Sequence, residues 1–195
     1  MAQRSRLPDH IQPGIRILFV GINPGRRSAA TGHHYAGRSN RFWKLLHAAD
    51  LVPEPLTYQD DWRLPEWGLG LTNIISRCSA GIDVLEAEEY RAGVAALTRK
   101  VRRYQPQIVA LLGVTIFRTI FGQDRQLPSR LDLGLTGSSL AGASVFLLPN
   151  PSGRNAHYSY SQMLEAFQIL RRNMSAMTTG DLSKIDLRQD ETGRP

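Results

Sequence analysis

Cysteine is almost absent from the sequence. Cys78 stands alone among 195 residues, so the chain offers no intramolecular disulfide, no cysteine-built zinc site and no iron–sulfur cluster. No apolar run approaches the ~20 residues that a membrane span requires, and the N-terminal residues lack the apolar core of a signal peptide. These absences predict a soluble, cytoplasmic protein that tolerates a reducing compartment.

Lysine is also scarce, although the chain is basic. Lys44, Lys100 and Lys184 are the only lysines among 24 basic residues, and the formal net charge is +7. Nearly all the positive charge is therefore arginine, whose planar guanidinium group suits phosphate oxygens. Nucleic-acid binding and a basic surface that serves only solubility both fit this charge, and charge alone does not choose between them.

The length and the 42% hydrophobic content suit one domain with a substantial core. Residues 1–14 and 173–195 are polar and rich in turn-forming or charged residues. We expect these two segments to be mobile tails that flank a domain over residues 15–172.

Hydrophobic patterning predicts an alternation of strands and helices. Short apolar runs bounded by turn residues predict buried strands at 15–20, 69–75, 108–112 and 144–148. Helical spacing of apolar residues predicts helices at 39–49, 86–104, 115–121 and 159–172. The alternation indicates a single α/β domain with a short, mainly parallel central sheet covered by helices on both faces.

Two similar loops follow the first and last predicted strands. They read GINPG over residues 21–25 and PNPSG over residues 149–153. Asn, Pro and Gly are the residues expected where a chain leaves a strand sharply. In a parallel sheet, however, ligands bind beyond the carboxyl ends of the strands, so the two loops would bring Asn23 and Asn150 to one crevice.

Further motifs join these loops in a fixed order along the chain. They are Ser28-Ala29, Gly32, Tyr35-Ala36, Ser39-Asn40-Arg41-Phe42-Trp43 and, more weakly, Gly70-Leu71-Thr72-Asn73 with Arg77, and Tyr104-Gln105-Pro106 leading to Leu112-Gly113. With these motifs the chain resembles the mismatch-specific uracil-DNA glycosylases, of the family that contains thymine-DNA glycosylase within the uracil-DNA glycosylase superfamily. The resemblance extends from about residue 15 to residue 170, and the joint order of the motifs is highly specific.

The resemblance implies a DNA repair enzyme that hydrolyses the bond between a damaged base and its deoxyribose and so initiates base-excision repair. The target nucleotide has to leave the duplex, at a cost of ~ a few kcal/mol that is smaller for a mispaired base. Uracil opposite guanine is therefore the expected substrate, with thymine or other altered pyrimidines as further candidates. The implied partner is double-stranded DNA, with no metal or cofactor and a monomeric protein.

The resemblance also implies roles for individual residues of the expected site. Asn23 positions the water that attacks the sugar, and Tyr35 is the aromatic platform for the flipped base, worth ~1 to 3 kcal/mol of stacking. Asn150 either donates its amide to the leaving base or orients its own loop. Backbone amides of Gly21, Ile22 and Gly25 are expected to face the base oxygens that gain negative charge.

Other residues are expected at the edges of this site. By the same resemblance, Ser28 lies near the C5 edge of the base. The wedge loop that enters the duplex corresponds to Ser152, Gly153, Arg154, Asn155 and Ala156. Arg154 stands where some relatives have an apolar side chain, and it either stacks between bases or grips a phosphate.

Some residues and functions keep alternative interpretations. Asp83 is either a second catalytic group acting on the water or the cap of the helix that follows it. His33 and His34 lack a third metal ligand and are expected at the surface or facing phosphate. A non-catalytic module that binds a nucleotide or a modified base is the alternative function. A nucleoside-triphosphate or dinucleotide loop is disfavoured, because residues 21–25 lack both the Lys-Ser/Thr ending and the three-glycine pattern.

Overall fold

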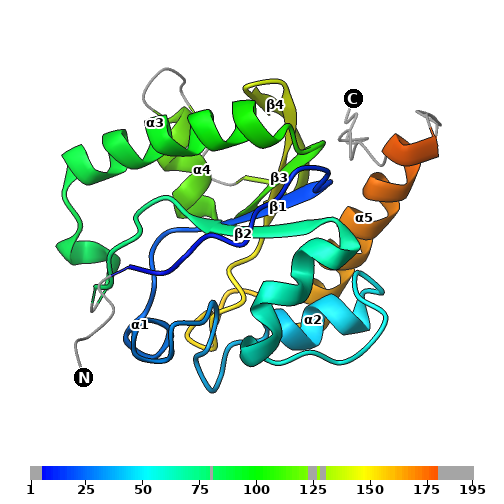
Figure 1. The fold of residues 1–195 in the computed structure, drawn as a ribbon, viewed down its shortest axis with the longest axis horizontal. Coiled ribbons are helices and arrows are strands. Elements are labelled where there is room, and N and C mark those ends of the chain that lie inside the picture. Colours follow the sequence, from blue (N-terminus) through cyan, green and yellow to red (C-terminus); the bar gives the residue numbers. More distant parts are fainter. Residues whose placement is uncertain (1–5, 80, 123–126, 128–130, 180–195) are drawn as a thin grey trace, which may run out of the picture.

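The computed structural model describes residues 6–79, 81–122, 127 and 131–179 (Figure 1). These residues contain a five-stranded sheet with the order β2-β1-β3-β5-β4. Its parallel strands are β1 (Ile17–Gly21), β2 (Leu69–Asn73), β3 (Ile108–Leu112) and β5 (Ala143–Leu148). The edge strand β4 (Gly134–Leu140) runs antiparallel to β5.

Helices cover both faces of the sheet, with α3 and α4 on one face and α2 and α5 on the other (Figure 1). The α-helices are α1 (Arg26–Thr31), α2 (Phe42–Ala48), α3 (Ala87–Tyr104), α4 (Val114–Phe121) and α5 (Tyr160–Thr179). Two 3₁₀ helices are η1 (Tyr58–Trp67) and η2 (Ile82–Val84). In the described part of the chain, none of the helices combines the length and apolar character needed to cross a membrane.

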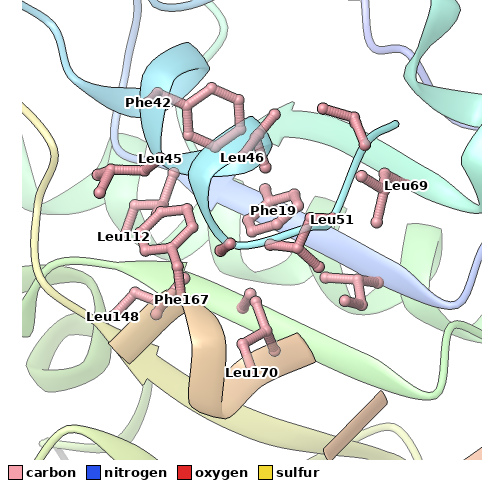
Figure 2. Packing of buried hydrophobic residues seen from close by; sticks show 14 of the residues in the cluster. Phe19, Phe42, Leu45, Leu46, Leu51, Leu69, Leu112, Leu148, Phe167 and Leu170 are labelled. Atoms are coloured by element: carbon pink, nitrogen blue, oxygen red, sulfur yellow. The ribbon is translucent and has the colours of Figure 1, made fainter. Parts of the chain in front are cut away.

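The parallel strands β1, β2 and β3 are buried on both sides, as expected for a parallel sheet between helical layers. Alternate residues of β1 point to opposite faces, so Phe19 belongs to one core cluster and Leu18 to the other. Figure 2 shows Phe19 among side chains of α2 and α5. Its ring lies 5.3 Å from the ring of Phe42 on α2 and 6.3 Å from the ring of Phe167 on α5. The first strand is thereby fixed between two helices that are distant in sequence.

The predicted fold class is confirmed, and the four predicted strands and four predicted helices are all present. The strand at 108–112 has the predicted bounds, and the other elements have shifted boundaries. Four elements were not anticipated, and one of them is the short 3₁₀ helix η2. The edge strand β4 has the sequence GLTGSSL, without an apolar run, and α1 has only six residues. The sequence of η1 is largely polar, but the capping box between Thr57 and Asp60 was a readable signal for its start.

Both predicted tails contribute described residues to the domain. Helix α5 continues beyond Arg172, and the side chains of Asn173 and Met174 are buried. At the other end, Leu7 is buried, and His10 exchanges two backbone hydrogen bonds with Leu71 of β2, at 3.0 and 2.9 Å. The polar composition of these segments concealed the few residues that pack. Residues 1–5 and 180–195 of the predicted tails lie outside the described residues.

Candidate active site

A pocket of about 580 Å³ opens at the carboxyl ends of the parallel strands. Its walls come from the loop after β1, the ends of β2 and β3, the loop after β5, and residues 34–40. The connections that leave β1 and β3 run to opposite sides of the sheet, so this is the edge at which α/β sheets bind ligands. The fold therefore places a pocket where the two Asn-Pro loops were predicted to meet.

The pocket brings together most of the predicted site residues. Those in its lining are Gly21, Ile22, Asn23, Gly25, Ser28, Tyr35, Asn150, Ser152, Gly153 and Arg154. Asp83, Asn155 and Ala156 are not among the lining residues. The two asparagines of the paired loops thus share one cavity, although 127 positions separate them in the sequence (150 − 23).

Asn23 is held by its amide nitrogen. Nδ2 donates to Oγ of Ser79 at 2.7 Å and to the carbonyl oxygen of Pro24 at 3.2 Å. The Ser79 hydroxyl in turn donates to the carbonyl oxygen of Gly81. Because the only hydroxyl hydrogen of Ser79 is used in this way, Ser79 accepts from Asn23, and the Asn23 carbonyl oxygen is the atom directed away from it. Sequence reasoning did not select Ser79, since a serine in a polar loop carries no distinguishing signal.

Tyr35 forms an aromatic wall of the pocket. Its ring lies 4.3 Å from the buried ring of Phe42, at a tilt of 35°, so the core supports the platform from behind. Its hydroxyl is buried without a hydrogen-bond partner among the described residues, and this burial raises the pKa of the phenol far above its ordinary value. Tyr35 also has a φ of 51°, a left-handed conformation that a non-glycine residue adopts only where neighbouring contacts impose it.

The floor of the pocket lies where β1 and β2 end side by side. A Cβ atom placed on Gly21 would clash with Oδ1 of Asn73 and would lie 3.1 Å from the Tyr35 hydroxyl oxygen. The φ of Gly21 is not positive, so backbone conformation does not require a glycine at this position. Glycine is needed because the Asn73 side chain and the Tyr35 hydroxyl lie close to its Cα. Asn73 is a lining residue with little exposure that the sequence reasoning did not include in the site. Its place in the motif at 70–73 and its position at a strand end were the available signals.

The Asn150 loop is braced by its own polar side chains. Oδ1 of Asn150 accepts from the backbone N–H of Ser152 at 3.0 Å, and Nδ2 of Asn155 donates to the Asn150 carbonyl oxygen at 2.9 Å. Of the two predicted roles of Asn150, orienting the loop is thus the one with a hydrogen bond in the structure. Asn155 supports the loop from outside the pocket, and Ala156 is exposed beyond it.

The same loop packs directly on the segment before α2. A Cβ atom on Gly153 would clash with the side chain of Ser39 and would lie 2.7 Å from its carbonyl oxygen. The backbone N–H of Arg41 donates to the carbonyl oxygen of Pro151 at 2.9 Å. This close approach fixes the predicted wedge loop relative to the segment that carries Tyr35.

Arginines surround the opening of the pocket. Arg26, Arg27 and Arg154 are lining residues and are exposed to solvent. Across the described residues, none of their guanidinium groups forms an ion pair with an acidic side chain. The guanidinium of Arg27 lies 5.7 Å from the centre of the Tyr58 ring. The opening therefore presents cations that are available to an anionic ligand.

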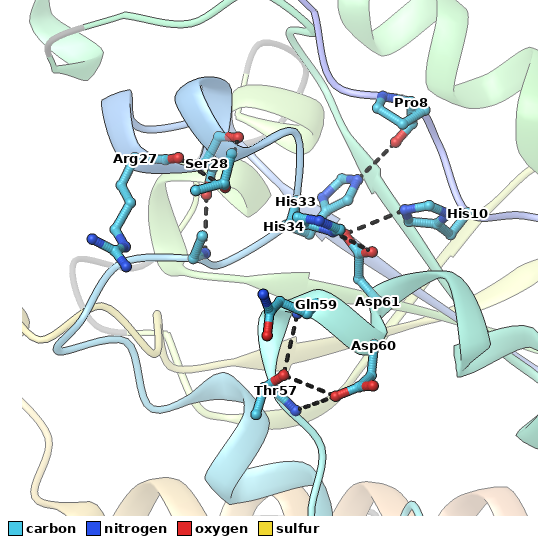
Figure 3. A network of polar contacts seen from close by, with 12 residues as sticks. Pro8, His10, Arg27, Ser28, His33, His34, Thr57, Gln59, Asp60 and Asp61 are labelled. Carbon is cyan, nitrogen blue, oxygen red and sulfur yellow. Dashed lines mark hydrogen bonds and ion pairs between the residues drawn. The ribbon is translucent and has the colours of Figure 1, made fainter.

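The predicted surface position of His33 and His34 is wrong for His34, which is almost fully buried. Both residues bind Asp61 of η1: Nδ1 of His33 lies 2.9 Å from one carboxylate oxygen, and the His34 backbone N–H donates to the other at 2.8 Å (Figure 3). Asp61 lies in the ten-residue helix η1, whose sequence is largely polar. Nothing in that sequence indicated that its carboxylate would be buried. His34 thus belongs to an internal network, whereas the His33 side chain is 32% exposed.

Asp83 is exposed on η2 and does not cap α3. The residue at the N-cap of α3 is Glu86, which forms a capping box with Glu89. Glu89 is also paired with Arg77, and this pairing lowers the pKa of Glu89 to about 2. The capping interpretation of Asp83 is therefore wrong, because the helix begins three residues later than such a cap requires.

A second hollow, of about 640 Å³, lies near the amino ends of β1 and β2. Its lining includes Arg16, Trp67 and Arg171 but none of the predicted site residues. The Arg16 guanidinium donates to the Trp67 carbonyl oxygen at 3.3 Å, and Nε of Arg171 donates to the carbonyl oxygen of Asp50 at 2.9 Å. Both guanidinium groups are hydrogen-bonded to backbone carbonyls of the fold. We therefore expect the active site at the other end of the strands.

Fold and pocket together define an α/β domain with a pocket between two Asn-Pro loops, beside the partly buried ring of Tyr35. A family model described as "Uracil DNA glycosylase superfamily" matches residues 8–171. The chain belongs to the uracil DNA glycosylase superfamily. This membership supports a DNA glycosylase function in general terms and DNA as the class of substrate.

A solved structure shows the same architecture. The chain is similar to the solution NMR structure of a proposed uracil DNA glycosylase from Methanosarcina acetivorans, with a TM-score of 0.55 and 18% sequence identity. The match covers 86% of this chain and 98% of the other. At this identity the similarity supports the fold alone.

Proposed function

We propose that the chain excises uracil from G·U-type mismatches in double-stranded DNA by hydrolysis of the N-glycosidic bond. The observation that carries this proposal is the placement of Asn23 and Tyr35 in one pocket, with the Asn23 amide oriented by Ser79. A flipped pyrimidine that packs against Tyr35 would put its sugar near the loop that holds Asn23. The resulting abasic site would start base-excision repair.

Asn23 would hold the attacking water through its carbonyl oxygen. An amide oxygen orients a water molecule but is a poor general base, so the reaction has to proceed with the base already leaving and the sugar resembling an oxocarbenium ion. The leaving uracil then carries negative charge on its ring oxygens. Hydrogen-bond donors already placed at those oxygens lower the barrier, and the backbone amides of Gly21, Ile22 and Gly25 and the side chain of Asn73 line the pocket that would receive them.

Duplex DNA would lie across the pocket opening, where the exposed side chains of Arg26, Arg27 and Arg154 are found. Arg26 and Arg27 are suited to phosphate oxygens, whose contacts fix the register of the protein on DNA. Arg154 projects from the rigid loop at residues 150–156 and is available to occupy the space that the flipped base leaves. A mispaired base costs less to extrude than a paired one, which gives a physical reason for preferring G·U mismatches.

The test is a strand-cleavage assay on a labelled duplex with a single G·U pair, in which alkali cuts the abasic product. Wild-type protein in excess should cleave the uracil strand and leave a matched G·C duplex intact. Asn23→Ala should lower the single-turnover rate by about 100-fold or more, because the water loses its holder, while duplex affinity stays unchanged.

Substrate scope follows from the same assay. Duplexes with thymine or another altered pyrimidine opposite guanine report how the pocket treats the C5 edge of the base. Ser28 is a lining residue, and we expect it to lie near that edge. Tight binding of the G·U duplex without any strand cleavage would instead identify a non-catalytic module that holds an altered base.

A further inference from the structure

Asp61 is a buried carboxylate that the proposed chemistry does not use. Its side chain is 1% exposed and lies beneath the segment that leads to Tyr35 (Figure 3). Burying a charged carboxylate is costly unless hydrogen bonds and opposite charge compensate it. The contacts that compensate Asp61 also tie it to other segments of the chain.

The contacts of Asp61 join two separate parts of the chain to η1. His33 and the backbone N–H of His34 bind its two oxygens, at 2.9 and 2.8 Å. From the N-terminal segment, Nε2 of His10 lies 3.3 Å from Oδ2 but is too poorly aligned for a hydrogen bond. The contribution of His10 is therefore electrostatic, whereas His33 and His34 are anchored directly.

The carboxylate is expected to be ionised. Burial by itself raises the pKa of Asp61, but the nearby imidazole of His10 and the hydrogen bonds from the His33 side chain and the His34 backbone outweigh burial and hold the pKa below its ordinary value. A charged acceptor makes shorter and stronger hydrogen bonds than a neutral one. Removing the charge while keeping the shape is thus the informative substitution.

These anchors stand immediately before the strained residue. Tyr35 has a φ of 51°, which its neighbours have to enforce. The N–H of His34, on one side, is held by Asp61, and the N–H of Ala36, on the other, donates to Oγ of Ser28 at 3.1 Å. Tyr35 is therefore clamped between two side-chain acceptors that come from different helices, η1 and α1.

We propose that Asp61 is a positioning residue, which fixes the His33–His34 segment so that the ring of Tyr35 stands against the pocket in the orientation that receives the flipped base. This inference rests on the proposed function for its catalytic consequence. The anchoring itself is a property of the fold. Asp61 acts through Tyr35 and touches no reacting atom.

A double-mutant cycle tests this coupling. Asp61→Asn should lower the single-turnover excision rate on the G·U duplex by about tenfold, since a misplaced binding surface costs rate without touching the reacting atoms. In a Tyr35→Ala background the same substitution should change the rate by less than about threefold, because residues that act as one unit are not additive. Affinity for an undamaged duplex should not change in either background.

Matched variants separate positioning from a general loss of stability. Asp60→Asn removes a neighbouring acid of η1 whose side-chain hydrogen bonds within the described residues go to Thr57 in the capping box, and it should leave the rate unchanged. His33→Ala removes one half-exposed partner and should reproduce part of the Asp61→Asn effect if Asp61→Asn itself fails to fold. Amide hydrogen exchange over residues 32–36 should accelerate in Asp61→Asn and His33→Ala but not in Asp60→Asn.

The outcomes distinguish this inference from the proposed function. Equal losses from Asp61→Asn in the wild-type and Tyr35→Ala backgrounds, or unchanged exchange over residues 32–36, would overturn the positioning role. A wild-type protein that excises no uracil would refute the proposed function, and the exchange measurement would still decide whether Asp61 anchors the segment.

Discussion

The side-chain nitrogen of Asn23 donates to the hydroxyl oxygen of Ser79 at 2.7 Å. This bond joins the loop after β1 to the loop after β2, at the edge of the sheet where the pocket opens. Ser79 is itself buried and bonded to Gly81, so the amide of Asn23 is held by a partner that has little freedom to turn. The orientation of the proposed water-holding oxygen is thus a consequence of the sheet order.

Removal of the Ser79 hydroxyl should disturb catalysis more than binding. We expect Ser79→Ala to lower the single-turnover excision rate by about tenfold, which corresponds to a hydrogen bond worth ~1.4 kcal/mol. Ser79→Thr keeps the acceptor and should retain most of the rate. A rate for Ser79→Ala equal to that of the wild type would show that Asn23 needs no such orientation.

The floor of the pocket should be sensitive to a single methyl group. Gly21→Ala is compatible with the strand backbone, but its Cβ would clash with Oδ1 of Asn73 and displace that side chain. We expect excision to fall by about tenfold or more, since misplacement of a contact in an active site is costly, with an unchanged thermal midpoint. Gly37→Ala is the control, because its Cβ would meet only the Cβ of Asn40, at 3.8 Å. Equal activity of the two variants would contradict a role for this floor.

Arg154→Ala separates the two predicted roles of that side chain. If Arg154 fills the gap left by a flipped base, the variant should bind an abasic duplex about tenfold more weakly and should bind single strands as the wild type does. Arg99→Ala removes the same charge from the exposed face of α3 and should alter neither affinity. Equal weakening on single and double strands would make Arg154 a phosphate contact, with a reduced salt dependence.

The sequence predicted which residues lie at the carboxyl ends of the strands. It did not predict the side-chain contacts that hold these residues in place. Asn23 and Asn150 follow buried apolar runs, and a parallel sheet leaves one edge at which such residues meet. That inference required only the order of strands and helices. Ser79 and Asp61 could not be found in this way, because each acts through partners that are at least 27 positions distant in the chain.

Local polarity also misled the prediction in specific places. A polar segment such as residues 6–14 carries no apolar periodicity, yet Asp9 pairs with Lys100 of α3 at 2.7 Å and accepts from Thr72 of β2 at 2.7 Å. Asp83 resembled a cap because a helix follows it, whereas the capping box starts at Glu86. For Asp9 and for Asp83 the local sequence allows more than one role, and only the tertiary structure decides which one is adopted.

The buried histidine of the Asp61 network should make stability depend on pH. Nε2 of His34 lies 2.8 Å from the carbonyl oxygen of Pro8, which requires a proton on that nitrogen. Burial lowers the pKa of His34 below its ordinary value of 6.5. The Pro8 carbonyl and the charges of Asp61 and Asp9 oppose this shift without cancelling it, and His10 adds to it. His34 is therefore neutral in the folded state at a pH where the unfolded chain is already protonated.

Below pH 6.5 the unfolded state thus binds more protons than the folded state, and the free energy of unfolding should decrease as the pH falls. The slope contributed by His34 is at most ~1.4 kcal/mol per pH unit. It should be visible in urea titrations between about pH 6.5 and 5.5, above the range in which most carboxyl groups titrate. His34→Gln, which keeps an N–H donor for Pro8, should flatten the slope, whereas His47→Gln on the exposed face of α2 should not. Identical slopes for the wild type and His34→Gln would mean that His34 takes up its proton equally in the folded and the unfolded state.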